Sequence, residues 1–278
     1  MTNTRTATVA DVLRALETFA PWALAEEWDN PGLQVGDPGR AVTKIWTALD
    51  PLPEIVAKAT AARCDLLLTH HPLFFHPVKS VDLSQTLMRG VATAIKSDLA
   101  IVAAHTNLDS AQNGVNFLLA EKIGLRNCRA LIAADDVFSS PERPCGLGRV
   151  GDLEYSISLG ELAGKINRVF GGGTVRLAGD LDLIVERVAV CGGSGGSLLP
   201  DFIRSGAQAF VSGDFGYHQA LEAEPGGYGL IDLGHFRSEH IIVEPLAELL
   251  ENALMELGFD VIVEAYKAQK EPFKYIGD

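Results

Sequence analysis

Two adjacent histidines, His70 and His71, follow a short apolar run and precede Pro72. Neighbouring side chains of a regular strand point to opposite faces, so both rings can reach one site only if the strand ends before them. Pro72 favours that ending, because proline cannot donate a hydrogen bond to a central ladder. Neutral imidazoles at a rigid strand end are common ligands of first-row divalent metals. The alternative is one buried, hydrogen-bonded histidine beside one exposed histidine.

Two acidic residues recur at one spacing after other histidines. Asp109 lies four positions after His105, and Glu239 lies four positions after His235. If a helix begins at His235, positions 235 and 239 share one face and can bind a single ion. The alternative is that each acid stabilises a helix start through the helix dipole. Neither pair forms the His-Glu-x-x-His motif or its inverse, so a metalloprotease is poorly supported.

These histidines and acids follow predicted strands, and ligand sites of α/β proteins gather at the carboxyl ends of strands. Cysteine does not contribute to the pattern, because no Cys-x-x-Cys pair occurs and we expect neither a disulfide framework nor a thiolate zinc site. The isolated cysteines are Cys64, Cys128, Cys145 and Cys191. Two hard-to-borderline ions bridged by carboxylate and water fit the remaining donors best.

Two further features leave alternatives open. Residues 191–197 (CGGSGGS) follow a predicted strand and precede a helix, which suits either a phosphate cradle or a tight turn. The stretch has neither the Walker lysine nor the full Rossmann spacing. Asp50, at the matching position of the first half, either orients a ligand or caps a helix.

The elements that must position these residues alternate between strand and helix patterns, which predicts an α/β fold with mostly parallel, buried strands. In the first part of the chain, strands are predicted at 44–49, 65–69 and 99–104, and helices at 55–62, 87–95 and 115–123. From about 128 to 181 the pattern changes to short strands (146–151, 155–159 and 174–177) around one helix (161–170). Strands resume at 187–190, 209–211 and 230–233, before a long helix near 241–257 and a strand at 260–263.

The two α/β stretches show one plan used twice. Residues 44–47 align with 187–190 at an offset of 143, and 104–109 align with 234–239 at an offset of 130. The shorter offset suggests that the second half lacks the helix at 87–95. We therefore predict two pseudo-related α/β lobes facing a central metal cleft. The first comprises residues 1–127 together with the chain end from about 235 to 278, and the second comprises 128–278.

Composition excludes two classes of partner. The 278 residues carry 36 acids and 23 bases, a net charge of −13, with no Lys/Arg run. Nucleic acid and anionic membranes are therefore not expected partners. No run reaches the ~18 apolar residues of a membrane helix, and the first residues do not resemble a signal peptide, so we expect a cytoplasmic protein.

Taken together, these residues resemble the NIF-three-like dinuclear-metal family, whose members often carry the name GTP cyclohydrolase 1 type 2 homologue. The resemblance spans nearly the whole chain, and only the set of motifs is specific. The motifs are 27–36 (EWDNPGLQVG), 69–73 (THHPL), 105–109 (HTNLD), Gly213-Asp214 with His218, and 234–239 (GHFRSE).

The resemblance implies two divalent ions per chain, with Zn, Fe and Mn all suited to imidazole and carboxylate. The implied metal ligands are His70, His71, Asp109, His235 and Glu239. It also implies a homohexamer. Some relatives carry a further domain inserted between the lobes, and we expect none here because the span from 128 to 181 is too short to hold one. His105, Asn107 and His218 are candidates to orient water or the ligands, and no residue is assigned a catalytic role.

Two functions follow from such a centre. One is a metal-dependent hydrolase of a nucleotide-like or phosphorylated small molecule, in which two ions supply hydroxide near neutral pH. The other is a protein without catalysis that stores or delivers metal or serves as a scaffold.

Overall fold

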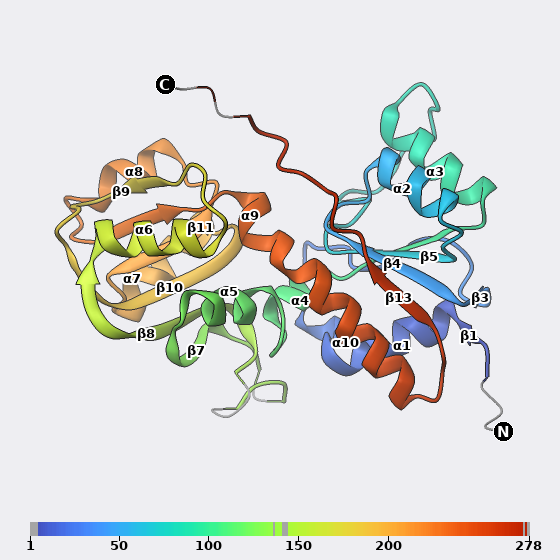
Figure 1. The fold of residues 1–278 in the computed structure, drawn as a ribbon, viewed down its shortest axis with the longest axis horizontal. Coiled ribbons are helices and arrows are strands. Elements are labelled where there is room, and N and C mark those ends of the chain that lie inside the picture. Colours follow the sequence, from blue (N-terminus) through green and yellow to red (C-terminus); the bar gives the residue numbers. More distant parts are fainter. Residues whose placement is uncertain (1–4, 136, 141–143, 275, 277–278) are drawn as a thin grey trace. The chain divides into compact units, whose positions relative to one another are not determined.

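A computed structural model describes residues 5–135, 137–140, 144–274 and 276, and the chain divides into two compact units (Figure 1). Unit 1 comprises Met1–Leu108 and Ile242–Gln269, and unit 2 comprises Asp109–Ile241 and Lys270–Asp278. The predicted boundary at 127/128 differs from this division over residues 109–127. Helix α5 (Val115–Ile123), which lies in that stretch, packs against strands of unit 2.

Unit 1 is built on a five-stranded sheet in the order β13-β4-β5-β6-β2. The strands are β13 (Ile262–Ala265), β4 (Lys44–Ala48), β5 (Leu66–Thr69), β6 (Ala100–Ala103) and β2 (Gly32–Val35). The first four are parallel, and β2 runs antiparallel beside β6. Every residue of β5 and β6 is buried, as expected for parallel strands covered on both faces.

Helices cover both faces of the sheet in unit 1 (Figure 1). Helices α2 (Pro53–Ala61) and α3 (Thr86–Lys96) pack together on one side, and α1 (Val9–Phe19) and α10 (Val243–Glu256) pack together on the other. Thr8 and Asp11 form a capping box that starts α1. The remaining elements are β1 (Ala7–Thr8), β3 (Ala41–Val42), the 3-10 turn η1 (Trp22–Leu24) and α4 (Thr106–Ser110).

Unit 2 is built on a six-stranded sheet in the order β7-β8-β10-β11-β12-β9. The strands are β7 (Arg126–Ala133), β8 (Gly146–Ser158), β10 (Ile184–Ser194), β11 (Ala209–Gly213), β12 (Gly229–Asp232) and β9 (Arg176–Ala178). The inner strands β10, β11 and β12 are parallel, and the others pair antiparallel. Two predicted strands, 146–151 and 155–159, are one bent strand, β8.

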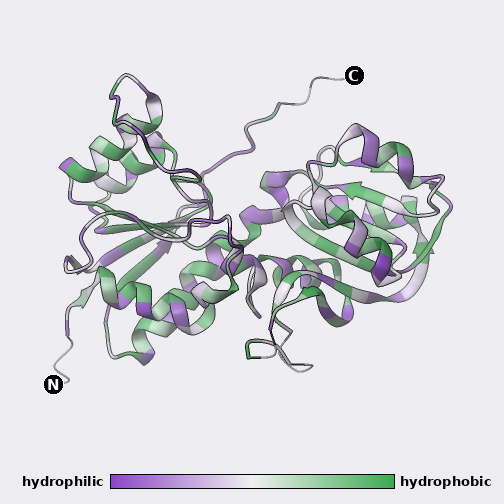
Figure 2. Ribbon diagram, turned by 180° about the vertical axis from the view of Figure 1, so that it is seen from behind, coloured by the Kyte–Doolittle hydropathy of each residue, from purple (hydrophilic) through white to green (hydrophobic). Residues whose placement is uncertain are grey.

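Alternation along β10 divides the core of unit 2 between two faces. Val188 and Val190 join one cluster with α5 and α6 (Leu159–Val169), whereas Ala189 and Cys191 join another. That second cluster contains side chains of α7 (Leu199–Ser205) and α8 (Tyr217–Ala223). Figure 2 shows the hydrophobic residues concentrated on the strands of each unit. The unit also contains η2 (Gly196–Leu198), α9 (His235–Glu239) and the start of η3 (His240–Ile242).

The predicted repeat is present in the topology. Strands β4, β5 and β6 are parallel neighbours in that order, as are β10, β11 and β12. The predicted loss of a helix is wrong, because α8 lies between β11 and β12 where α3 lies between β5 and β6. The second half is shorter because α8 has seven residues against eleven and because the long connection before α3 has no counterpart.

No helix in the described ranges combines the length and the apolar character needed to cross a bilayer.

Candidate metal centre

Unit 1 brings three histidines together, and we call His70, His71 and His105 the histidine cluster. One ring nitrogen of each lies within 4.8 Å of one nitrogen of the other two. Their ring centroids are 5.0 to 5.6 Å apart. His70 is fully buried, His105 is buried, and the His71 side chain is 13% exposed. Three imidazoles at this spacing are suited to bind a divalent metal ion.

Strand ends place the cluster. Strand β5 ends at Thr69, as the two-histidine argument predicts, and both following rings turn toward one another. The backbone N–H groups of His70 and His71 still donate to the carbonyls of Ala48 and Leu49, at 3.2 and 2.9 Å. This pairing keeps both residues anchored beside the end of β4. His105 occupies the equivalent place after β6, which is the next strand of the sheet.

The Nδ1 atom of each ring in the cluster faces an oxygen acceptor. His70 Nδ1 lies 3.0 Å from the carbonyl oxygen of Ala104. His71 Nδ1 lies 2.7 Å from Asp50 Oδ1, and His105 Nδ1 lies 2.8 Å from Asp29 Oδ1. A carbonyl or carboxylate oxygen can only accept, so Nδ1 carries the proton and donates in each ring. In the neutral imidazole the lone pair is then on Nε2, which is the arrangement of metal-binding histidines.

Hydrogen bonds also hold the two carboxylates that orient these rings. Burial alone would raise the pKa of Asp29, but hydrogen bonds from His105 and from both the N–H and hydroxyl of Thr106 lower it to about 2. Asp50 accepts a hydrogen bond from the amide of Gln269. Asp29 therefore stays ionised at neutral pH, and the hydrogen bonds of both carboxylates keep their acceptor atoms directed at the rings.

Unit 2 contributes a histidine and an acid from one short helix. Helix α9 begins at His235, and the predicted shared face exists because His235 Nε2 lies 3.0 Å from Glu239 Oε2. His235 Nδ1 lies 2.8 Å from Asp214 Oδ2. A carboxylate therefore orients this ring, as carboxylates orient His71 and His105 in the histidine cluster. The Glu239 side chain is 4% exposed, whereas that of His235 is 39% exposed.

A glycine turn makes room for the Glu239 carboxylate. Gly193 has φ +63°, and a Cβ at this position would lie 2.1 Å from Glu239 Oε1. The backbone N–H groups of Gly192 and Gly193 donate to Asn116 Oδ1 and Ser238 Oγ, at 2.8 and 2.9 Å. Acceptors of the protein itself therefore engage these two donors of the turn. Glycine at position 193 is required for the close approach of the Glu239 carboxylate.

Asn116 links the segments that carry the two acids. Its amide nitrogen donates to the backbone carbonyl of Asp109 at 3.0 Å, while its amide oxygen accepts from Gly192.

Burial raises the pKa of the Cys191 thiol well above its usual range, and the charges of Asp109 and Glu239 raise it further. Both carboxylates therefore lie near one buried thiol. Two buried like charges favour a bound cation.

The fully buried Arg149 fixes the backbone beyond Asp109. Its guanidinium donates to the carbonyl of Ala111 at 2.8 Å and to those of Gly146 and Gly148 at 2.6 and 2.8 Å. Burial lowers the pKa of Arg149 to about 10, which leaves it charged at neutral pH. The chain that follows α4 is thus held by a buried cation.

The residues proposed to orient water have different surroundings. Both polar atoms of the buried Asn107 side chain bond to backbone, with Oδ1 accepting from His105 and Nδ2 donating to Ala20. His218 is exposed on α8, with its ring against Tyr217. Sequence reasoning did not assign the orienting roles of Asp29, Asp214 or Asn116. Only the motifs at 27–36 and 213–214 contained a signal for the first two.

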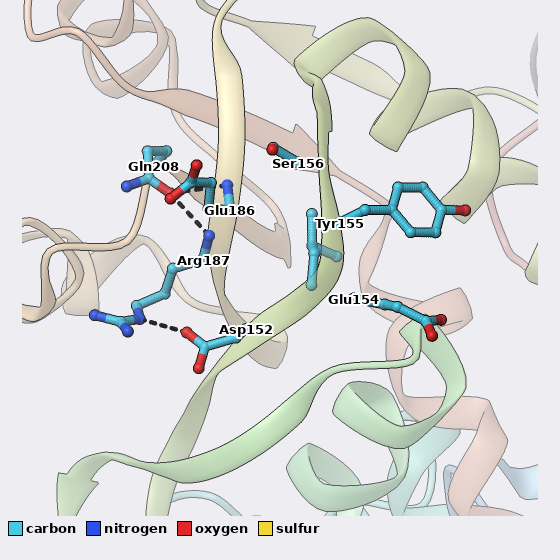
Figure 3. A pocket seen from close by; sticks show the side chains of 8 residues that line it. Asp152, Glu154, Tyr155, Ser156, Glu186, Arg187 and Gln208 are labelled. Atoms are coloured by element: carbon cyan, nitrogen blue, oxygen red, sulfur yellow. Dashed lines mark hydrogen bonds and ion pairs between the residues drawn. The ribbon is translucent and has the colours of Figure 1, made fainter.

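The donors of each unit suit a divalent metal. Unit 1 offers the imidazole nitrogens of the histidine cluster, and unit 2 offers the imidazole of His235 and the carboxylate of Glu239, which are ligands that suit Zn, Fe and Mn. A hollow of ≈ 440 Å³ elsewhere in unit 2, between β8 and β10, has no such character (Figure 3). Its Asp152 pairs with Arg187 at 2.8 Å, and its Glu154 pairs with Arg126 at 2.7 Å. No histidine lines this hollow.

Comparisons with known proteins agree over nearly the whole chain. The family model of Duf34/NIF3 (NGG1p interacting factor 3) matches residues 7–272. A "GTP cyclohydrolase 1 type 2 homolog" of Clostridium perfringens is 33% identical over 266 residues, covering 96% of this chain and 98% of the relative. A protein of the same name from Streptomyces coelicolor is 35% identical over 268 residues, covering 95% and 93%.

Solved structures show the same fold. The Staphylococcus aureus hypothetical protein SA1388 is 30% identical with a TM-score of 0.89, covering 98% of this chain and 100% of that one. A Bacillus cereus protein related to NIF3 has a TM-score of 0.90 at 23% identity, with coverage of 98% and 100%.

Proposed function

Since this chain belongs to the Duf34/NIF3 (NGG1p interacting factor 3) family, we propose that it binds two divalent metal ions and uses them to hydrolyse a small molecule. The proposed ligands are His70, His71, Asp109, His235 and Glu239. The substrate class is a nucleotide-like or other phosphorylated compound. The relatives' name suggests a cyclohydrolase, but no feature of the described residues indicates hydrogen bonding to the edge of a purine base.

One observation carries the metal assignment. Four histidines, His70, His71, His105 and His235, each direct Nδ1 at an oxygen acceptor within 3.0 Å. Histidines that only fill a core have no reason to share this orientation, whereas metal-binding histidines need it to fix the tautomer with Nε2 as ligand. His105 thereby joins the proposed ligands as a further candidate.

The protein's own residues divide the work of such a reaction. Bound divalent ions supply Lewis acidity, which makes hydroxide available near neutral pH. Asp50 and Asp214 hold His71 and His235 in the ligating tautomer. Asn107 holds the backbone of His105, so its role is to position that ring. Among the histidines of this set, His235 has the most exposed side chain, at 39%, and is the most open to an incoming molecule.

A metal-by-metal activity screen tests the hydrolase. The protein is loaded separately with Zn, Fe and Mn, its metal content is measured, and each form is incubated with a pool of phosphorylated metabolites. We expect two ions per chain and saturable loss of one compound class, which Asp109→Asn abolishes together with tight metal binding. Two bound ions without turnover of any compound would contradict the hydrolase.

Metal storage or delivery is the second candidate, favoured by the 39% exposure of the His235 side chain. An exposed ligand allows an ion to exchange with solvent or a partner. In that case a fluorescent chelator should withdraw one ion quickly and the other slowly, with no saturable turnover. A catalytic centre should instead be inhibited by substrate-like anions at an open coordination position.

A homohexamer in the cytoplasm remains part of the proposal, supported by the family resemblance alone. Light scattering coupled to gel filtration should give about 180 kDa for six chains of 29.7 kDa. A mass near that of one chain would contradict it.

A further inference from the structure

Two exposed aromatic side chains lie against the buried His105 of the histidine cluster. Trp28 is 62% exposed and Phe75 is 46% exposed. Their ring centroids lie 6.1 and 5.5 Å from that of His105, in edge-on arrangements of 76° and 88°. Both therefore contact the same imidazole while keeping much of their own surface open to solvent.

Hydrogen bonds of the neighbouring residue Asp29 fix the segment that carries Trp28. Trp28 immediately precedes Asp29, whose buried carboxylate binds His105 and Thr106. The turn that presents it is closed by a hydrogen bond from the Asp29 N–H to the Glu26 carbonyl at 3.0 Å. This part of the chain is thus tied to the segment that follows β6.

The loop that carries Phe75 is tied down in a similar way. The carbonyl of Phe74 accepts a hydrogen bond from the Asn30 amide at 2.7 Å, and its N–H donates to Gln34 Oε1 at 3.2 Å. Asn30 belongs to the same segment as Trp28, so these hydrogen bonds join the two backbone segments that carry the rings. Rings on segments joined in this way form a prepared surface, because binding to them requires little ordering of the backbone.

Trp46, another tryptophan of unit 1, shows which contacts the fold gives to an indole ring that has a structural role. Trp46 stacks on Tyr266 with centroids 5.2 Å apart, and its Nε1–H donates to Glu264 at 2.9 Å. Trp28 has neither a stacked ring nor an acceptor for Nε1–H among the described residues. The fold uses the face and the donor of Trp46 but leaves those of Trp28 available.

We propose that Trp28 and Phe75 form an aromatic subsite that binds a flat heteroaromatic ring of the substrate beside the metal centre. The inference rests on the proposed function, because only that function makes the bound ring part of a substrate. Two side chains offer far less than the ~800 Å² per partner that a stable protein interface buries. A ring is the ligand of matching size and chemistry, because aromatic faces stack on aromatic faces.

Paired ligands with and without a ring test the subsite. The probes are AMP, GMP and ribose 5-phosphate, which share sugar and phosphate and differ in the base. Calorimetry on the metal-loaded full chain should show both nucleotides binding more tightly than ribose 5-phosphate. Trp28→Leu should weaken nucleotide binding by about 5- to 150-fold, the range of one base–aromatic stack. It should leave ribose 5-phosphate binding and metal content unchanged.

Three controls make the result specific. Trp28→Phe should retain most of the nucleotide affinity, and Ile95→Ala, which shortens an exposed apolar side chain elsewhere in unit 1, should change nothing. Light scattering on Trp28→Leu should give the wild-type mass. A lower mass would show that the rings pack between copies of the chain and would overturn the subsite.

Equal binding of nucleotides and ribose 5-phosphate by the wild-type chain would also overturn it, as would a Trp28→Leu variant that binds nucleotides as tightly as the wild-type chain does. The failure of the proposed function is distinguishable from this outcome. A chain without bound metal that still prefers nucleotides through Trp28 would retain the subsite and lose only the metal assignment.

Discussion

The histidine cluster of unit 1 and the His235–Glu239 pair of unit 2 follow equivalent strands but are held in different ways. In unit 1, three largely buried rings are fixed from outside by Asp29, Asp50 and a backbone carbonyl. In unit 2, a buried carboxylate fits against a glycine turn, and its histidine is half-exposed. The first region fixes neutral donors, whereas the second supplies negative charge.

This difference indicates how each region responds to change. A neutral ring that loses its orienting acceptor can still bind a metal in a less favourable tautomer. A carboxylate that is displaced removes both a ligand and the charge that attracts the cation. We therefore expect metal content to be more sensitive to the surroundings of Glu239 and Asp109 than to those of the histidine cluster.

The largest expected effect comes from Gly193→Ala. The new Cβ would occupy the place of Glu239 Oε1, and the residue would also have to adopt φ +63°. Strain and overpacking together should destabilise the chain by roughly 2–5 kcal/mol. Elemental analysis should find at least one ion lost.

Gly206→Ala is the matched control for Gly193→Ala. Gly206 has φ +76°, but its added Cβ would meet no atom within 4 Å. It should cost about 1–2 kcal/mol in unfolding free energy and keep both ions. Equal metal content in the two variants would show that the glycine turn does not position the acid.

A pair of buried asparagines offers the next comparison. Asn116→Ala in unit 2 and Asn107→Ala in unit 1 each leave one backbone N–H and one carbonyl without their side-chain partner. Both should lose roughly 2–4 kcal/mol of stability in urea titrations. Only Asn116→Ala should lower the metal affinity strongly, because it releases the segments of both acids. Equal losses of affinity would remove the distinction between the two regions.

The carboxylates that orient histidines should have smaller effects. Asp50→Asn should weaken metal binding by about 10- to 100-fold, the usual range for a residue that orients a ligand. Asp214→Asn should weaken it less, because His235 is 39% exposed and solvent can compensate for the lost negative charge. Competition with a chelator measures both constants. A larger loss for Asp214→Asn would reverse the order proposed here.

The smallest effect concerns alkaline stability in unit 1. Burial raises the pKa of Cys64 to about 12, well above that of an unfolded thiol. Stability from the neutral thiol is thus complete below about pH 8.5 and is lost as pH rises. Between pH 7 and 9, Cys64 alone should account for about 1 kcal/mol of the stability that the wild type loses. Urea titrations of Cys64→Ala should show that much less change over this interval, and an unchanged pH slope would contradict the assignment.

Much of the fold was predictable because hydrophobic periodicity and the ends of strands and helices depend on residues that are close together in the sequence. The apolar runs of β5 and β6, the stop of α5 at Gly124 and the start of α9 at His235 all depend on neighbours in sequence. The bent strand β8 was predicted as two strands because its register shift arises from pairing with β10. That pairing joins residues far apart in the chain.

The candidate site was predictable in its donors but less so in their supports. His70, His71 and the two four-residue spacings are visible in the sequence. Asn116 is not, because an asparagine inside a helical pattern carries no sign of the glycine turn it will contact. For the glycine-rich stretch the sequence favoured a tight turn and left a phosphate cradle open, and it gave no sign that Gly193 makes room for Glu239.

Metal stoichiometry tests the central claim most directly. Elemental analysis of the wild-type chain, reconstituted with excess Zn, Fe or Mn and then desalted, should find two ions per chain. The double variant His235→Ala/Glu239→Ala should retain fewer than two while circular dichroism shows an intact fold, because both units have apolar cores of their own. Two ions retained by the folded double variant would contradict the account.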